Sequence, residues 1–245
     1  MLFRSVVVKS GVCASANSTT AGVTVSPATV AGTASGDTTV CASGNSVTVR
    51  VSGSVGSIQW QRSTDNVNFS AISGATSATY STTNLTATTY YRARVKSGVC
   101  DSLFTNTVTV AVNPASVSGS ISGSTTVCYQ NNSTVLTLNG STGNIQWQSS
   151  ITSTTAGFNN VADSTANTIT ANNLTATTYY RAVVTSGVCA AATTSAATIT
   201  VSPATIAGTA SGDTTVCASG NSVTVRVSGS VGSIQWQRSE EHTSE

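Results

Sequence analysis

The chain has 245 residues, of which 7% are charged and 5% aromatic, and its formal net charge at pH 7 is +2. Because its few Lys and Arg residues form no cluster, the charge pattern gives no support for a nucleic-acid partner. No stretch approaches the roughly eighteen apolar residues that a membrane-spanning helix needs. Ser, Thr, Val, Ala and Gly dominate without any sustained helical period, so the composition predicts an all-β protein.

Three prolines divide the chain into four segments. Pro27, Pro114 and Pro203 lie 87 (114 − 27) and 89 (203 − 114) residues apart, and each follows an apolar run. Since proline cannot donate a hydrogen bond to a β-ladder, we interpret these prolines as linkers between repeats. The predicted segments are the end of a truncated repeat (1–26), two complete repeats (27–113 and 114–202) and the start of a truncated repeat (203–245).

Both tips of the chain depart from the repeat. Residues 202–239 match residues 26–63 at every position except that Ile206 replaces Val30, and the match stops at Glu240. Every glutamate and the single histidine fall in the last six residues. The two ends read like translated sequencing-adapter DNA, so we regard residues 1–5 and 240–245 as foreign and the rest as an internal piece of a longer chain.

Within each complete repeat, short alternating runs separated by Gly, Ser and Asn predict about seven strands. In the first repeat we expect Thr39–Cys41, Ser46–Ser52, Ser57–Arg62, Ala71-Ile72, Ala78–Ser81, Thr89–Lys96 and Phe104–Val112. In the second we expect Thr134–Leu138, Asn144–Gln148, Thr168–Thr170, Thr178–Thr185 and Thr194–Val201. Residues 6–26 should end in a strand at Ala21–Val25, and residues 203–239 should hold only the first three strands of a repeat. Seven strands in about 88 residues suit an immunoglobulin-like sandwich.

Aromatic residues recur once per repeat at positions that predict a core. Trp60 and Trp147 stand in the sequence Ile-Gln-Trp-Gln, where Ile and Trp share one strand face and the glutamines share the other. We therefore predict both tryptophans as core anchors, the alternative being a ligand platform. Tyr91 and Tyr180 are predicted as further core anchors, either as plain packing or as tyrosine corners.

Several runs of the first repeat resemble a known family. Ile58-Gln59-Trp60-Gln61, Asn84-Leu85-Thr86-Ala87-Thr88-Thr89-Tyr90-Tyr91-Arg92 and Ser97-Gly98-Val99-Cys100 are similar to the tandem Ig-like (PKD-like) repeats of large secreted bacterial surface proteins of the adhesin type. The resemblance covers nearly all of residues 6–239. It implies tandem immunoglobulin-like β-sandwiches and an extracellular or cell-surface location, and such repeats serve as adhesins, stalks or spacers beside catalytic domains.

Each complete repeat holds two cysteines, which are Cys41 and Cys100 in the first and Cys128 and Cys189 in the second. There is no CxxC pair and no histidine outside the foreign tip, so zinc binding and a Cys–His nucleophile are not indicated. Even numbers per repeat predict disulfides in an oxidising compartment, and we expect pairing within each repeat. In an Ig-like topology Cys41 and Cys100 lie near opposite poles, so pairing of Cys41 with Cys189 of the next repeat is the alternative.

Nothing in the sequence predicts catalysis. The five acids of the repeats are far apart, and neither a GxSxG motif nor a phosphate-binding loop is present. We therefore expect no catalytic, cofactor or metal site. The expected function is a structural spacer, with an adhesive module for a surface ligand or an accessory segment of a secreted enzyme as alternatives, and the expected partners are neighbouring repeats of the same chain.

Overall fold

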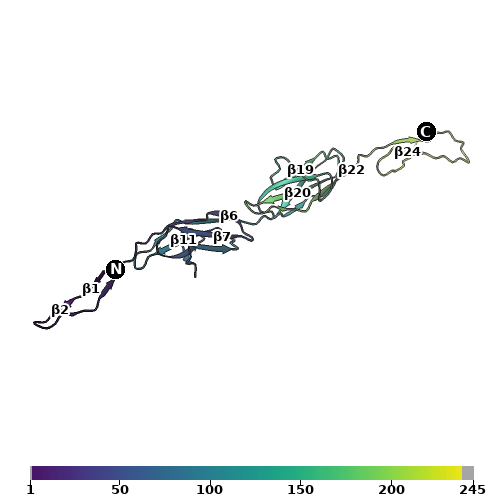
Figure 1. Cartoon of the computed structure of the whole chain (residues 1–245). Coiled ribbons are helices and arrows are strands. Elements are labelled where there is room, and N and C mark those ends of the chain that lie inside the picture. The colour runs from purple at the N-terminus through teal and green to yellow at the C-terminus, as the bar shows by residue number, and fades with distance from the viewer. Residues whose placement is uncertain (1, 239–245) are drawn as a thin grey trace. The chain divides into compact units, whose positions relative to one another are not determined.

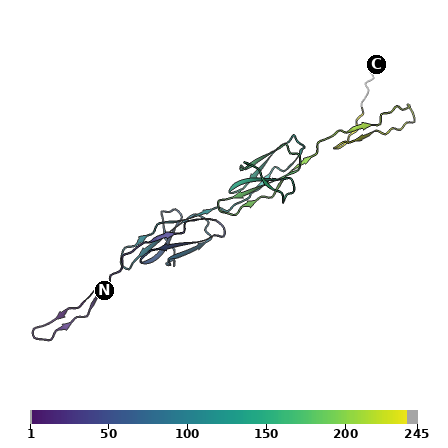
Figure 2. The same cartoon turned by 45° about the horizontal axis from the view of Figure 1, so that its top comes forward.

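The computed structural model describes residues 2–238, and every element in them is a β-strand. The chain divides into two compact units, Met1–Ser116 with Thr185–Ala190, and Val117–Val184 with Ala191–Glu245. Figures 1 and 2 show the sandwiches that these units contain from two directions. The all-β prediction is confirmed. The foreign tip predicted at 240–245 lies outside the described residues.

The first unit begins with two short ladders. Strand β1 (Leu2–Arg4) pairs with β4 (Ala21–Val23), and β2 (Val7–Val8) pairs with β3 (Ala16–Asn17), both antiparallel. Both pairings keep the register found one repeat later, since Leu2↔Val23 corresponds to Thr89↔Val110. The ladder between β1 and β4 consists of backbone hydrogen bonds, which any non-proline sequence can make, so its presence does not show whether residues 1–5 are foreign.

The first complete repeat is a sandwich of two sheets. Its smaller sheet has the order β10-β7-β5 and its larger sheet β6-β13-β11-β8-β9, with β12 paired to β11. The strands are β5 (Thr33–Ser35), β6 (Thr38–Cys41), β7 (Ser46–Ser52), β8 (Ser57–Ser63), β9 (Ser70–Ala71), β10 (Thr79–Thr83), β11 (Thr89–Lys96), β12 (Leu103–Phe104) and β13 (Val108–Asn113). All pairs are antiparallel except β6 with β13. After β5 the chain leaves the small sheet, and β6 pairs in parallel with β13, the last strand. This strand order is typical of an immunoglobulin-like sandwich.

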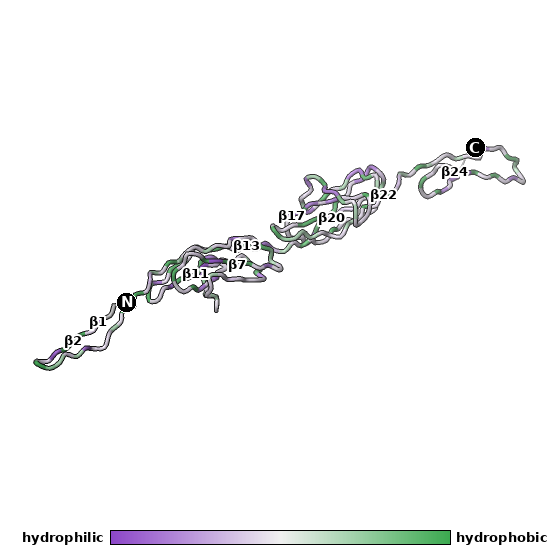
Figure 3. The backbone as a smooth tube through the Cα atoms, in the orientation of Figure 1, coloured by the Kyte–Doolittle hydropathy of each residue, from purple (hydrophilic) through white to green (hydrophobic). Residues whose placement is uncertain are grey.

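Alternation of apolar and polar residues builds this core. Val47, Val49 and Val51 on β7 point inward and are buried, whereas the Ser, Thr and Arg residues between them are exposed. Figure 3 shows the same mixture of hydrophobic and hydrophilic residues along the strands of both repeats. Trp60 lies between the sheets with no exposed surface, and its indole N–H donates to the carbonyl of Ser77 at 3.0 Å.

The second complete repeat has the same topology. Its sheets run β14-β16-β19 and β15-β22-β20-β17-β18, with β21 paired to β20 and β15 parallel to β22. The strands are β14 (Ser120–Ser122), β15 (Thr125–Cys128), β16 (Ser133–Asn139), β17 (Asn144–Ser150), β18 (Asn159–Asn160), β19 (Thr168–Asn172), β20 (Thr178–Thr185), β21 (Ala192–Thr193) and β22 (Ala197–Ser202). Trp147 is again fully buried at the centre.

One predicted strand, Phe104–Val112, is in fact two. The break falls at Thr105 and Asn106, whose side chains take over hydrogen bonds that a ladder would otherwise make. The Asn106 amide accepts from the Ala34 N–H at 2.8 Å and donates to the Ala34 carbonyl at 2.9 Å, so it holds β5 of the opposite sheet. The Thr105 hydroxyl accepts the N–H of Ala93 at 3.0 Å.

Residues 203–238 keep less structure than predicted for the third repeat. Among these described residues only β23 (Thr209–Ser211) and β24 (Arg226–Ser228) form, and Ser233–Gln237, expected as the third strand, is not a strand. Its counterpart β8 pairs with β11 over seven residues, and residues 203–238 contain no equivalent of β11. Trp236 is accordingly 52% exposed, although it stands in the same sequence as Trp60.

Candidate functional site

The most distinctive chemical feature of the first unit is a disulfide between Cys41 and Cys189, which are 148 residues apart with Cα atoms separated by 4.9 Å. Pairing within each repeat, Cys41 with Cys100 and Cys128 with Cys189, is therefore wrong. The reason is topological: Cys41 ends β6, whereas Cys100 lies in the hairpin between β11 and β12, and the two sit at opposite ends of one sandwich. The alternative pairing is the one that the structure has. Cys100 and Cys128, both predicted as disulfide candidates, carry free thiols.

Strand register and one asparagine position Cys41. The parallel pairing of β6 with β13 sets Cys41 opposite Asn113, and the N–H of Ala42 donates to the Asn113 carbonyl at 2.9 Å. The buried amide of Asn45 donates to the carbonyls of Cys41 and Leu85, both at 2.7 Å. It also accepts the N–H of Leu85 at 2.9 Å, so Asn45 fixes the end of the cysteine strand to the loop before β11.

A tight hairpin positions Cys189. The Cys189 N–H donates to the Ser186 carbonyl at 2.9 Å across a turn in which Gly187 has a φ of +51°. A Cβ atom at Gly187 would overlap the side chain of Asn113, whose amide oxygen accepts the N–H of Val188 at 3.3 Å. The hairpin therefore rests on Asn113, the residue beside Cys41, and this common neighbour brings the two sulfur atoms together.

The segment that follows Asn113 completes the contact. The N–H of Ser186 donates to the Ser116 hydroxyl at 2.9 Å, and the Cys189 sulfur lies 3.2 Å from the carbonyl oxygen of Pro114. All of these residues belong to the first unit, since Thr185–Ala190 is part of it. The proline segment between the repeats thus lies against the hairpin of Cys189, which the disulfide ties to Cys41.

An arginine held by aromatic rings lies on the outer face of each large sheet. The Arg92 guanidinium lies 4.0 Å from the ring centre of Phe69 and 4.2 Å from that of Phe104, and its Nε donates to Gln61 at 2.9 Å. Phe104 is 47% exposed. In the second repeat Arg181 lies over Phe158 at 4.1 Å and donates to Gln148 at 2.7 Å. The outward glutamines of the Ile-Gln-Trp-Gln sequence therefore orient these arginines, which sequence reasoning did not single out.

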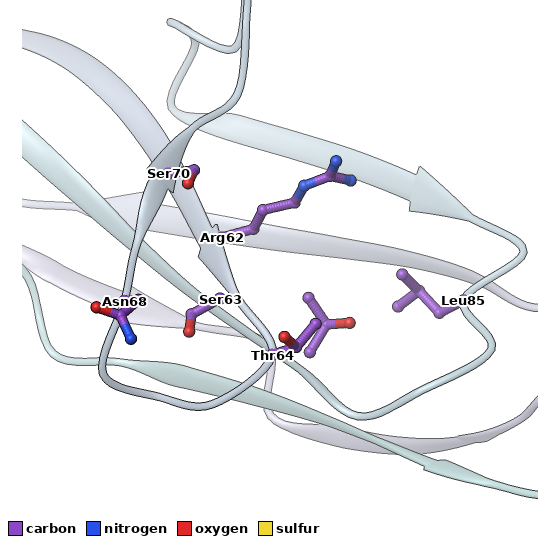
Figure 4. A pocket seen from close by; sticks show the side chains of 7 residues that line it. Arg62, Ser63, Thr64, Asn68, Ser70 and Leu85 are labelled. Atoms are coloured by element: carbon purple, nitrogen blue, oxygen red, sulfur yellow. The ribbon is translucent and has the colours of Figure 1, made fainter.

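A shallow hollow of about 440 Å³ lies at the end of β8 in the first repeat (Figure 4). It is lined by Arg62, Ser63, Thr64, Asn68, Ser70, Leu85 and Thr89. The adjoining loop is held by Asp65, whose carboxylate accepts from the Ser63 hydroxyl at 2.6 Å and from the N–H groups of Val67 and Asn68. These bonds, the one from Ser63 above all, hold the pKa of Asp65 well below its usual range.

The lining of this hollow offers one cation and several neutral polar groups, which suits contact with a polar or anionic group. It offers no pair of nucleophile and base. Within residues 2–238, no group of three or more His, Cys, Asp or Glu side chains is placed to hold a metal ion. The same residues contain no helix with the length and apolar character needed to cross a membrane.

The aromatic residues predicted as core anchors lie inside the sandwiches. Trp60 and Trp147 are fully buried, and the Trp147 indole N–H donates to the Ala166 carbonyl at 2.9 Å. Burial raises the pKa of Tyr91 and of Tyr180. None of these four rings is available at the surface as a ligand platform.

Fold and site together define a module of tandem immunoglobulin-like repeats with a structural or binding role. The model of a domain of unknown function, DUF8696, matches residues 30–114, 117–203 and 206–244. The chain belongs to this family, whose domain it matches three times in tandem, the third match being shorter than the other two.

Other comparisons add little to this assignment. No curated protein matches the chain. The FN1–FN3 domains of chicken CNTN1 are similar over 76% of this chain and 69% of theirs, at 10% identity and a TM-score of 0.36. Domains A168–A170 from titin are similar over 77% and 71%, at 15% identity and a TM-score of 0.42. A marsupial T cell receptor is similar over 74% and 77%, at 12% identity and a TM-score of 0.49. The fold assignment rests on the strand order and not on these likenesses.

Proposed function

We propose that the chain is a non-catalytic spacer, a run of sandwiches that sets the distance between other parts of a bacterial surface protein. The observation that carries this proposal is the bond between Cys41 and Cys189. A spacer needs consecutive repeats that do not separate, and a disulfide from one repeat to the hairpin of the next supplies this. The close similarity of the repeats in sequence, with residues 202–239 matching 26–63 at every position but one, supports the same role.

The proposed location is outside the cytoplasm, at the cell surface. Disulfides form and persist in oxidising compartments and are rare in a reducing cytosol. The Cys41–Cys189 bond is part of the folded repeat here, and the resemblance to secreted bacterial surface repeats supports the same placement.

Surface labelling of intact cells of the encoding organism tests this proposal. Antibodies raised against residues 27–202 should bind unbroken cells, and material shaved from the surface should yield a linked peptide pair containing Cys41 and Cys189. Antibody binding only after lysis, together with full alkylation of both cysteines in the native protein, would overturn the extracellular placement.

An adhesive module is the second candidate function, and the first repeat supplies a specific observation in its favour. Phe104 is half-exposed beside Arg92, and the hollow at Arg62 opens on the same repeat. Exposed aromatic rings and arginine are enriched in binding surfaces. The variants Phe104→Ser and Arg62→Ser should abolish retention on immobilised host glycans and matrix proteins if this role is correct. Equal and negligible retention of wild type and variants would favour the spacer.

A further inference from the structure

The cysteines fall into two structural classes that recur with the repeat. The early cysteines are Cys41 and Cys128, which end β6 and β15, and Cys217 at the matching position of the third repeat. The late cysteines are Cys13, Cys100 and Cys189, which lie in the hairpins. We propose that every early cysteine forms a disulfide with the late cysteine of the following repeat, so that Cys41–Cys189 is one member of a continuous series. The four free thiols are then half-sites of the same bond.

The early cysteines share one environment. The amide of Asn132 donates to the Cys128 carbonyl at 2.7 Å and to the Leu174 carbonyl at 2.9 Å, as Asn45 does for Cys41 and Leu85. Asn221 donates to the Cys217 carbonyl at 2.5 Å. The parallel pairing of β15 with β22 sets Cys128 opposite Ser202, just as β6 and β13 set Cys41 opposite Asn113. Cys128 is therefore presented beside the next linker in the way that Cys41 is.

The late cysteines share one turn geometry. The N–H groups of Cys13, Cys100 and Cys189 donate to Ser10, Ser97 and Ser186 at 3.0, 2.9 and 2.9 Å. The intervening glycines have φ values of +56°, +53° and +51°.

The contact between hairpin and linker is repeated too. The thiol of Cys100 lies 3.5 Å from the carbonyl oxygen of Pro27, as the Cys189 sulfur lies 3.2 Å from that of Pro114. A Cβ atom at Gly98 would overlap the Ser26 side chain, which stands where Asn113 stands one repeat later. Cys100 is therefore docked on its linker in the paired geometry, and only an early cysteine beside Ser26 is lacking.

Sequence spacing accounts for which thiols are free. The bonded pair is separated by 148 residues. The same step forward from Cys128 and Cys217 leads to positions 276 (128 + 148) and 365 (217 + 148), beyond the 245 residues. The same step backward from Cys13 and Cys100 leads below residue 1. Cys41 and Cys189 are thus the one pair for which both half-sites belong to these residues, and they are the pair that is bonded.

Formation of each bond is a two-electron oxidation. The two thiols lose their protons, one sulfur–sulfur bond forms, and the two electrons reduce a disulfide of an oxidant such as a thiol–disulfide exchange protein, which leaves as a dithiol. This pairing would hold for a spacer and for an adhesive module alike, and bond mapping tests it independently of either role.

Completing the third repeat provides the test. In the extended chain, a copy of residues 64–113 replaces residues 240–245, which is justified because residues 202–239 match 26–63. After expression in an oxidising compartment, free thiols are alkylated and disulfides are mapped by non-reducing peptide analysis. Cys128 should be alkylated in the original chain, and in the extended chain it should be linked to the copy of Cys100. Cys41→Ser in the extended chain should free Cys189 and leave the Cys128 bond unchanged.

A second extension tests the other end. Here a copy of residues 27–92 replaces residues 1–5, which completes the repeat that ends at residue 26, and Cys100 should become linked to the copy of Cys41. The Cys41–Cys189 bond in each sample reports that the central repeats have folded. Continued alkylation of Cys128 in the first extended chain and of Cys100 in the second, with Cys41–Cys189 intact, would overturn the proposal, as would links within one repeat.

Discussion

Replacement of Trp147 by alanine should be among the most damaging single changes in the second repeat. The indole is fully buried between the two sheets, and its N–H donates to the Ala166 carbonyl. Truncation of a buried Trp to Ala typically costs about 3–5 kcal/mol, since the cavity only partly closes. A domain's whole stability is about 5–15 kcal/mol. Trp147→Ala should therefore remove a large share of the stability of this repeat.

Trp236 offers a matched control for this change. It stands in the same Ile-Gln-Trp-Gln sequence but is 52% exposed, because residues 203–238 form no strand equivalent to β11. Urea unfolding followed by far-ultraviolet circular dichroism should show a midpoint for the second repeat lowered by about 2 M in Trp147→Ala, given the usual denaturant dependence for small domains. Trp236→Ala should leave the midpoint unchanged. Equal effects of the two substitutions would refute the assignment of Trp147 to the core.

The remaining predictions concern the disulfide and the Asp65 loop. Cys41→Ser opens a loop of 148 residues and should destabilise the oxidised protein by up to about 5 kcal/mol in the chain-entropy model. Reductant should lower the unfolding midpoint of the wild type by the same amount and leave that of the variant unchanged. Identical midpoints of wild type and variant under oxidising conditions would contradict this. Gly187→Ala should increase the alkylation of Cys189, because the added Cβ atom would overlap the side chain of Asn113. Gly140→Ala is the control, since Gly140 also has a positive φ but its added Cβ atom would meet open space, and it should not increase this alkylation. Equal alkylation of Cys189 in both variants would show that backbone strain alone is responsible. Since the folded state depresses the pKa of Asp65, its carboxylate stabilises the fold above about pH 4 and loses this effect as the pH falls further. The melting temperature of Asp65→Asn should therefore lie below that of the wild type at neutral pH and converge with it in acid, and a constant difference across that range would show that the charge is not responsible.

The fold was predictable because its signals are local. The alternation on β7 and the Ile-Gln-Trp-Gln run on β8 each indicate which face of the strand is apolar. Seven such strands in about 88 residues predict a sandwich. The short strand β5 of the smaller sheet was not predicted. Its sequence, Thr-Ala-Ser, buries only Ala34, and its position depends on Asn106, which is 72 residues away in the chain.

The disulfide could not be fixed from the sequence, because its geometry depends on two long-range pairings. Cys41 reaches the linker only because β6 runs parallel to β13, and Cys189 reaches it only because a glycine hairpin fits over Asn113. Neither relation leaves a local pattern. The spacing of the cysteines was equally compatible with pairing inside a repeat, and the expected distance between the two poles was the one sign against it.

The aromatic contacts of Arg92 and Arg181 on the outer face of each large sheet were missed for a similar reason. Arg92 and Gln61 are paired across β11 and β8, and the aromatic rings that enclose the guanidinium come from residues 69 and 104. The recurrence of Arg181 with Gln148 and Phe158 in the second repeat was the available signal. An Arg and a Gln that recur at the same register of two adjacent strands predict such a contact.

The bond between Cys41 and Cys189 also decides how the chain would carry a pulling force. Tension applied between residues 27 and 202 passes from Cys41 directly to Cys189, so the 148-residue stretch between them bears no load even when both sandwiches unfold. At about 3.5 Å per extended residue, this bond withholds about 500 Å of contour length until it is reduced. With the pairing proposed for Cys217, the load-bearing backbone between one sulfur bridge and the next would be the 28 residues (217 − 189) from Cys189 to Cys217. Such a chain would extend very little under tension, and the contour length between the bonded cysteines would become available only when thiols reduce the disulfides.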